Sequence, residues 1–193
     1  MARVKEFDEA EVLDQALELF RARGYRHTSF ADLVDELGVG RQSLYDTYGD
    51  KHALFLAALR RYLARGQDHM RRALADEATP VRAAFLQLLE GMLAGQCSSG
   101  HPGCLMVNSM VELAPHDADV RALAQEHART IEGLFASRLA AAQRRGELGA
   151  DKDPVALARY LHHTILGLAV ASRGLGDADG LRTTGRLALQ ALD

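Results

Sequence analysis

The sequence predicts an all-α protein built from nine helices. In one stretch after another, apolar residues recur with the i, i+3, i+4, i+7 spacing that places them on one face of a helix. No stretch shows the sustained alternation of β-branched and polar residues that is typical of a strand. The chain has only 4 prolines, and each falls in an expected loop or at an expected helix end.

The first four helices are marked by local start and stop signals. Gly24 ends the first helix and Gly38 ends the second, as glycines commonly do. Either Thr28 or Ser29 caps the second helix, and Asp50 caps the fourth. The expected ranges are 8–23, 30–37, 41–48 and 50–75.

The later helices show similar signals. Thr79-Pro80 and Asp153-Pro154 each combine a capping residue with a proline at the first helical position. The stretch from Cys97 to Gly103 is expected to be a loop. The expected ranges are 80–96, 104–113, 119–145, 154–173 and 179–192.

Composition limits the possible classes of protein. The formal net charge is −3, and residues 1–66 carry 10 Lys/Arg against 11 Asp/Glu, a local net of −1. A nucleic-acid binder with this balance must use individually placed residues, because it has no basic field. Apolar runs stay well short of the roughly 20 residues of a membrane span. With no apolar signal segment and only two cysteines, a cytoplasmic location is expected.

Two of the short helices, 30–37 and 41–48, form a predicted helix-turn-helix unit. In such a unit the second helix enters the DNA major groove with its N-terminal residues first. Arg41 and Gln42 carry the hydrogen-bonding groups that match guanine and adenine. Hydroxyls on this helix, and a lysine in the first turn of the next, are expected to contact phosphates. These residues are Ser43, Tyr45, Thr47 and Lys51, whereas Leu44 and part of Tyr48 turn inward.

The segment GYRHTSFADLVDELGVGRQSLYDTYGDKHALF resembles the DNA-binding signature of TetR-family transcriptional regulators. The match covers about residues 8–55, and through it Thr28 and Tyr48 join the DNA-binding residues. Gly40 departs from the family pattern by replacing a Ser/Thr cap, and Gln42 replaces a small residue. Asp46 places a carboxylate on a helix that faces phosphates, where it either contacts cytosine or points back at protein. The matching pieces are Gly24-Tyr25, Thr28, Gly38-Val39, Leu44-Tyr45, Tyr48, Gly49 and Lys51.

The resemblance implies a nine-helix architecture with two domains. Residues 1–50 are the expected helix-turn-helix domain, and residues 51–193 the expected effector-binding and dimerisation domain. The implied protein is a homodimer on double-stranded, palindromic operator DNA, released by a small-molecule effector. The last two helices are expected to form the dimer interface, unless their apolar residues form the core of the chain itself. The residues concerned are Leu161, Ile165, Leu168, Ala169, Leu187, Leu189 and Leu192.

The segment around Cys104 suggests a chemical sensor. Cys104 follows a Pro-Gly loop at a predicted helix N-terminus, where a thiolate is stabilised, and Cys97 is a candidate resolving thiol. Similar Gly-Cys-Leu segments occur in TetR-family regulators that sense electrophiles or oxidants. Asn108 and Met110, on the same predicted helix, are candidate effector contacts. Alternatively, the cysteines are small buried hydrophobic residues, and the polar side chains only cap a helix or face solvent.

The leading hypothesis is therefore a DNA-binding transcriptional regulator, most often a repressor in this family. The alternative is a metal- or ligand-binding helical bundle that does not bind DNA. An enzyme is not expected, because no catalytic triad, paired-carboxylate motif, phosphate-binding loop or dinucleotide fingerprint occurs. The second half has five histidines without HxxxH spacing, so neither a metal site nor a cofactor is expected.

Overall fold

A computed structural model of the chain describes residues 7–98 and 103–193, without the side chains of residues 96–98. Over these residues the chain forms nine α-helices and a final 3₁₀ turn, with no strand, which confirms the predicted fold class. No helix in this part of the chain is long and apolar enough to cross a membrane. The helices are α1 Glu9–Arg23, α2 Phe30–Leu37, α3 Arg41–Tyr48, α4 Lys51–Ala73, α5 Val81–Ser98, α6 Leu105–Glu112, α7 Ala118–Arg144, α8 Pro154–Gly174, α9 Ala178–Ala188 and η1 Leu189–Leu192.

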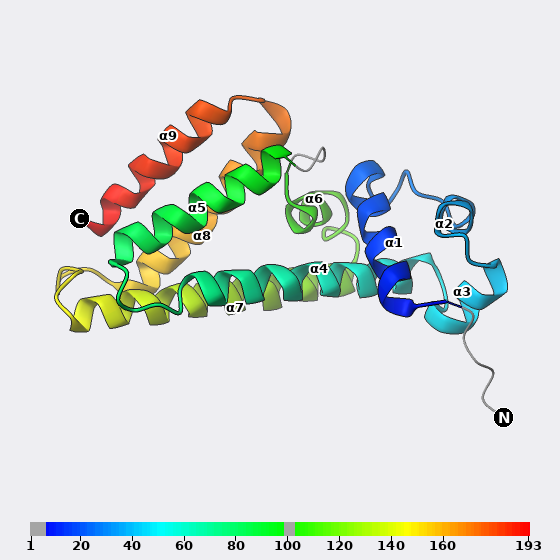
Figure 1. The fold of residues 1–193 in the computed structure, drawn as a ribbon, viewed down its shortest axis with the longest axis horizontal. Coiled ribbons are helices and arrows are strands. Elements are labelled where there is room, and N and C mark those ends of the chain that lie inside the picture. Colours follow the sequence, from blue (N-terminus) through cyan, green and yellow to red (C-terminus); the bar gives the residue numbers. More distant parts are fainter. Residues whose placement is uncertain (1–6, 99–102) are drawn as a thin grey trace.

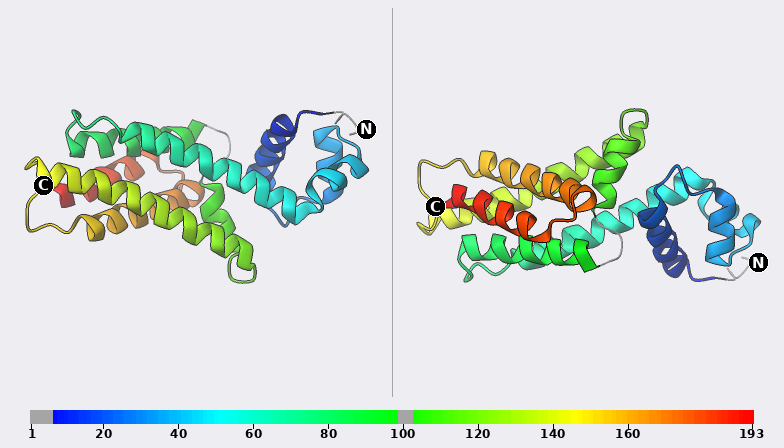
Figure 2. Two further views of the ribbon diagram at one scale, coloured as in Figure 1. Left: turned by 90° about the horizontal axis from the view of Figure 1, so that it is seen from below. Right: turned by 90° about the horizontal axis from the view of Figure 1, so that it is seen from above.

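The molecule is elongated, with α1, α2 and α3 gathered at one end (Figure 1). From this end, α4 extends into the body of the molecule, which also contains α5, α7, α8 and α9. Helix α6 lies between that body and α1 (Figures 1 and 2). The C-terminus lies at the opposite end, beside the turns that follow α4 and α7 (Figure 2). The helix-turn-helix unit is therefore presented at a tip of the molecule.

Two clusters of buried side chains hold the fold together. The first joins α1, α2 and α3 to the N-terminal half of α4, to α6 and to the start of α7. The second lies among the end of α4 and helices α5, α7, α8 and α9. Because α4 contributes Leu54 and Phe55 to the first cluster and Met70 to the second, it belongs to both cores. The domain boundary expected after residue 50 falls at the N-cap of α4 and stays a prediction.

One predicted helix start is displaced by a long-range contact. Thr79 does not cap α5, because its hydroxyl donates to Asp76 and the helix begins at Val81. The N–H of Val81 donates instead to the carboxylate of Glu147, at 2.8 Å, from the turn after α7. The helix also continues through Cys97 to Ser98, into the expected loop. A local capping pattern in the sequence cannot reveal a hydrogen-bond acceptor that lies 66 residues away.

The apolar residues expected at the dimer interface lie mainly in the chain's own core. Six of the seven are buried within the single chain, so the alternative that they form the core is confirmed for those six. Leu187 is the exception, with 56% of its surface exposed. Periodicity locates an apolar stripe on a helix, but it does not tell whether the stripe meets α7 or a second chain. The six buried residues are Leu161, Ile165, Leu168, Ala169, Leu189 and Leu192.

Candidate DNA-binding surface and thiol site

The helix-turn-helix unit is built by capping groups and glycines. Ser29 caps α2 in a reciprocal capping box: its hydroxyl accepts from Asp32 N at 3.1 Å, and its own N–H donates to the Asp32 carboxylate at 2.7 Å. Gly38 ends α2 with a φ of 63°, in the left-handed region that glycine adopts at little cost. Gly40 precedes α3 without a side-chain cap. Consequently α3 depends mainly on tertiary packing for its position.

That packing is supplied by Leu44, the one buried side chain of α3. Leu44 has no exposed surface and lies in the same cluster as Leu33 and Leu37 of α2. Tyr48 is partly buried against this cluster, and its hydroxyl donates to the backbone oxygen of Glu9 at 3.3 Å. With these side chains turned inward, the opposite face of α3 points away from the protein.

The outward face of α3 carries long polar and aromatic side chains. Phe30, at the start of α2, supports two of them: the Arg41 guanidinium carbon lies 5.4 Å from its ring centroid, and the Tyr45 ring lies 4.8 Å away. Such contacts with an aromatic face limit the freedom of both side chains while leaving their polar ends outside. The exposed residues are Arg41, Gln42, Tyr45 and Asp46, and the partly buried ones are Ser43 and Thr47.

Asp46 is bonded to a neighbour on the same helix. Its carboxylate accepts a hydrogen bond of 2.8 Å from the Gln42 side-chain amide, one turn earlier. Both side chains are exposed, so this bond lies on the outward face of α3, and the two alternatives raised by the sequence for Asp46 stay predictions. The bond uses one N–H of Gln42 and leaves the carboxamide oxygen and the second N–H to other partners.

Two predicted DNA contacts, Thr28 and Lys51, already have partners within the protein. Thr28 has no exposed surface, and its hydroxyl donates to Gly24 O at 2.8 Å, so it has nothing to offer a phosphate. The Lys51 ammonium donates to Tyr25 O at 3.1 Å and to Thr28 O at 2.9 Å, and it lies 4.0 Å from the Tyr25 ring centroid. Both side chains therefore hold the turn between α1 and α2, which the sequence pattern could not show.

Contacts that the sequence did not reveal join the helix-turn-helix end to the body. Arg26 donates its backbone N–H to the Glu112 carboxylate, at 3.0 Å, and its guanidinium to Glu112 O, at 3.4 Å. His52 bonds the Asp117 carboxylate at 2.8 Å. Burial raises the pKa of Asp117, but the Val120 N–H and His52 outweigh it and leave the pKa below the ordinary value. The partners are 86 and 65 residues apart, beyond the range of any local pattern.

Cys104 is the N-cap of α6, immediately before the helix that the sequence predicted to contain it. It is half-buried, and the Tyr62 hydroxyl of α4 donates to its sulfur at 3.4 Å. Burial raises the pKa of Tyr62 above its ordinary value, and the neighbouring Cys104 raises it further. The phenol therefore keeps its proton. The side chain of Cys97 lies outside the described residues, and so does the predicted pairing of the two thiols.

The other candidate effector contacts on α6 separate in the structure. Asn108 is half-buried, whereas Met110 is 36% exposed and faces the surface. The roles of Asn108 and Met110 as effector contacts stay predictions. Glu112, at the end of α6, holds Arg26 of the helix-turn-helix end. Both ends of α6 are thus tied, Cys104 to α4 and Glu112 to the turn between α1 and α2.

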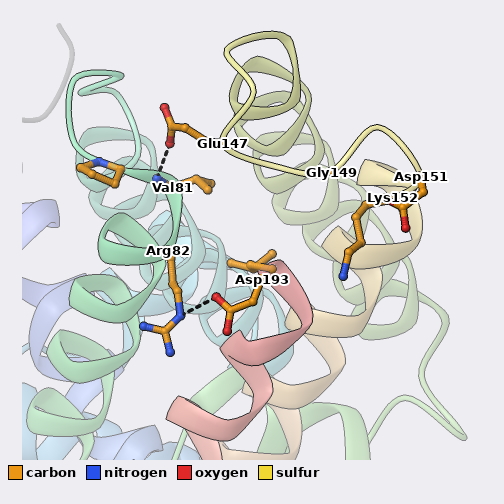
Figure 3. A pocket seen from close by; sticks show the side chains of 9 residues that line it. Val81, Arg82, Glu147, Gly149, Asp151, Lys152 and Asp193 are labelled. Atoms are coloured by element: carbon orange, nitrogen blue, oxygen red, sulfur yellow. Dashed lines mark hydrogen bonds and ion pairs between the residues drawn. The ribbon is translucent and has the colours of Figure 1, made fainter.

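A pocket of about 590 Å³ lies beside the C-terminus, at the end of the molecule opposite α1–α3 (Figure 1), and Figure 3 shows its lining side chains. Three of its charged groups already have partners: Arg82 pairs with Asp193 at 3.1 Å, and the Lys152 ammonium donates to Ala191 O at 3.3 Å. For that reason we assign no ligand to it. The lining residues are Pro80, Val81, Arg82, Glu147, Gly149, Asp151, Lys152, Leu192 and Asp193.

Comparison with protein-family models gives two matches. The model described as bacterial regulatory proteins, tetR family, matches residues 12–58 and so covers the helix-turn-helix unit. The model described as the tetracyclin repressor-like C-terminal domain matches residues 82–187. The two matches together span both ends of the molecule.

Individual relatives agree with the family models. The chain is 37% identical over 195 residues to the uncharacterized HTH-type transcriptional regulator YezE of Bacillus subtilis (strain 168), covering 100% of both chains. It is 33% identical over 176 residues to the HTH-type transcriptional repressor ComR of Escherichia coli (strain K12), covering 89% of this chain and 82% of that protein. A solved structure of a cysteine mutant of the regulator CifR, complexed with 26bp double-strand operator DNA, matches with a TM-score of 0.88 and 29% identity, covering 99% of this chain and 100% of CifR.

Proposed function

Because this chain belongs to the tetR family of bacterial regulatory proteins and is a DNA-binding transcriptional regulator, we propose that it is a repressor of a palindromic operator. It binds the operator as a homodimer and leaves it when its C-terminal domain binds an effector or is modified at Cys104. The proposed action is binding and not catalysis, and a cytoplasmic location follows from access to the chromosome.

The observation that carries this proposal is the arrangement of α3. Leu44 anchors the helix from below while Arg41, Gln42 and Tyr45 stand outside the protein. A helix in the major groove needs side chains with this reach. Arg41 matches the two acceptors of guanine, and Gln42 matches adenine through its carboxamide.

The remaining polar groups of α3 are suited to phosphates. Tyr45 is exposed, and Ser43, Thr47 and Tyr48 are partly so. Hydroxyl contacts to phosphates fix the register of the protein on the duplex without selecting a sequence. Two relatives support the proposal: ComR is a transcriptional repressor, and CifR was solved in complex with operator DNA.

The proposed dimer interface uses the outer faces of α8 and α9. A groove of about 410 Å³ between these helices is lined by Gly167, Ala171 and Gly180, among others. Small residues let a second helix approach closely. Large apolar side chains on the same two helices and the turn between them are exposed in the single chain, and a second copy would cover them. They are Tyr160, Val170, Leu175 and Leu187.

The test of DNA recognition is fluorescence anisotropy with a labelled fragment of the upstream intergenic DNA and a scrambled competitor. Arg41→Ala and Gln42→Ala are each expected to cost about 1–3 kcal/mol of operator binding and to relax base preference. Arg129→Ala and Gln125→Ala, exposed residues on α7, are the matched controls. Operator selectivity that survives Arg41→Ala would contradict the role of α3.

Release through Cys104 is favoured by one specific observation, the Tyr62 hydroxyl 3.4 Å from its sulfur. That donor stabilises a thiolate when the sulfur attacks an electrophile. With an α,β-unsaturated carbonyl compound, the sulfur forms a bond to the β carbon. The electron pair of the double bond moves to the α carbon, which then takes a proton from water.

The adduct adds bulk where α6 meets α4, and the other end of α6 holds Arg26 through Glu112. N-ethylmaleimide is therefore expected to release the wild-type chain from its operator. The Cys104→Ser variant should stay bound, and Cys97→Ser should respond like the wild type. Release of the Cys104→Ser variant would reject the thiol route and leave the repressor proposal to be judged on the α3 variants.

A further inference from the structure

Three potential metal ligands meet at the contact between α7 and α8. Glu132 of α7 and the adjacent His162 and His163 of α8 each offer one ligand atom, and these atoms all lie within 4.8 Å of one another. His162 is 3% exposed, Glu132 is half-buried and His163 is exposed. Two nitrogens and one carboxylate oxygen form a ligand set that zinc and related metals favour.

The spacing of the inner two ligands fits a shared ion. His162 Nδ1 lies 3.4 Å from Glu132 Oε1. An N–H···O hydrogen bond is usually about 2.7–3.2 Å long, so this contact is loose. In a tetrahedral site with metal–ligand bonds of about 2.0–2.1 Å, neighbouring ligand atoms stand about 3.3–3.4 Å apart.

The ring of His162 is buried at the contact between α7 and α8. His162 Nε2 is buried without a hydrogen-bond partner among the described residues, so the recorded polar contact of the ring is at Nδ1.

A second cluster in the described residues, His52 with Asp117 and Asp119, is less suitable. Its His52–Asp117 contact is 2.8 Å, the length of an ordinary hydrogen bond. The Asp117 carboxylate also caps α7 by accepting from Asp119 N and Val120 N, both at 3.0 Å. A metal there would have to replace the His52–Asp117 hydrogen bond, whereas the contact between Glu132 and His162 is longer, at 3.4 Å.

We infer that Glu132, His162 and His163 bind one divalent transition-metal ion of the zinc class. The exposed His163 side chain turns towards the other two ligands, and solvent supplies the fourth position. The ion links α7 to α8, so it binds the folded state and stabilises it. This inference does not depend on the proposed operator or effector, because the ligands lie away from α3 and Cys104. Sequence spacing gave no sign of it, since Glu132 is 30 residues from His162.

The test uses the full chain stripped of metal with a chelator. Titration with Co²⁺ should give the visible absorption of a tetrahedral ion, saturating at one equivalent, and Zn²⁺ should displace it. Glu132→Gln and His163→Gln should each weaken Zn²⁺ binding by about tenfold or more. Zn²⁺ should raise the Tm of the wild type and have little effect on the Tm of these variants.

One control separates ligation from other effects. His69→Gln removes an exposed histidine outside both clusters and should bind Zn²⁺ like the wild type. Circular dichroism confirms that each variant is folded. The inference is overturned if the wild type binds no Co²⁺, if Glu132→Gln and His163→Gln bind Zn²⁺ like the wild type, or if binding is lost in His52→Gln instead.

Discussion

Replacing Lys51 with methionine tests whether this residue contacts DNA or holds the turn between α1 and α2. Lys51→Met keeps most of the aliphatic stem and removes the ammonium that bonds Tyr25 O and Thr28 O. A hydrogen bond to a charged group contributes about 1.5–3 kcal/mol, and an ammonium over an aromatic ring contributes about 0.5–1 kcal/mol at an exposed site. Because one half-buried ammonium serves all three partners, we expect a loss of about 2 kcal/mol and not the sum.

Urea denaturation followed by circular dichroism measures this loss. The expected midpoint for Lys51→Met is lower than that of the wild type, and Arg60→Met, at an exposed cation of the same helix, should unfold like the wild type. A protein with a typical stability of about 5–15 kcal/mol remains folded after the change. Its operator affinity can therefore be measured as a function of salt.

The salt dependence decides between the two roles. Each phosphate contact that is lost reduces the slope of log affinity against log salt by about 0.9. If Lys51 holds the turn, the slope is unchanged and only the stability falls. A variant with wild-type stability and a slope reduced by about 0.9 would refute the reasoning and return Lys51 to the phosphate contacts.

Two further variants test the core. Leu44→Ala should reduce the free energy of unfolding by about 2–5 kcal/mol and weaken operator binding, since Leu44 is fully buried and anchors α3; an unchanged urea midpoint would contradict this. Burial is the main cause, and nearby His162 the second, of a His127 pKa lowered from 6.5 to about 4. The stability that the neutral imidazole contributes to the folded state is therefore present above pH 6.5 and is lost as the pH falls to about 4. His127→Gln should flatten the pH dependence of stability in that window, whereas His69→Gln should leave it unchanged.

The parts of the fold that the sequence predicted depend on local signals. The capping box at Ser29, the glycine at position 38 and the cap at Asp50 act within a few residues, and each marks a boundary of the helix-turn-helix unit. The outward face of α3 was predictable for the same reason. The helix has eight residues and one buried side chain, Leu44, so the opposite face must point away from the protein.

The parts that escaped prediction depend on partners distant in the chain. Glu147 caps α5 from 66 residues away, and Glu132 meets His162 across 30 residues. Lys51 looked like a phosphate ligand because its position at a helix N-terminus favours anions, yet carbonyls from the preceding turn reach its ammonium first. The sequence shows which hydrogen-bonding groups a side chain carries, but the folded structure determines which partners those groups bind.

The continuous helix α4 has a mechanical consequence. It has 23 residues, Lys51–Ala73, and is about 34 Å long at the usual rise per residue. A rod of that length tilted by about 5° moves its far end by about 3 Å. A small tilt of α4 caused by repacking around Met70 therefore becomes a larger movement of the end of the molecule that carries Arg41. In a dimer, the distance between the two α3 helices would then no longer match the helical repeat of DNA.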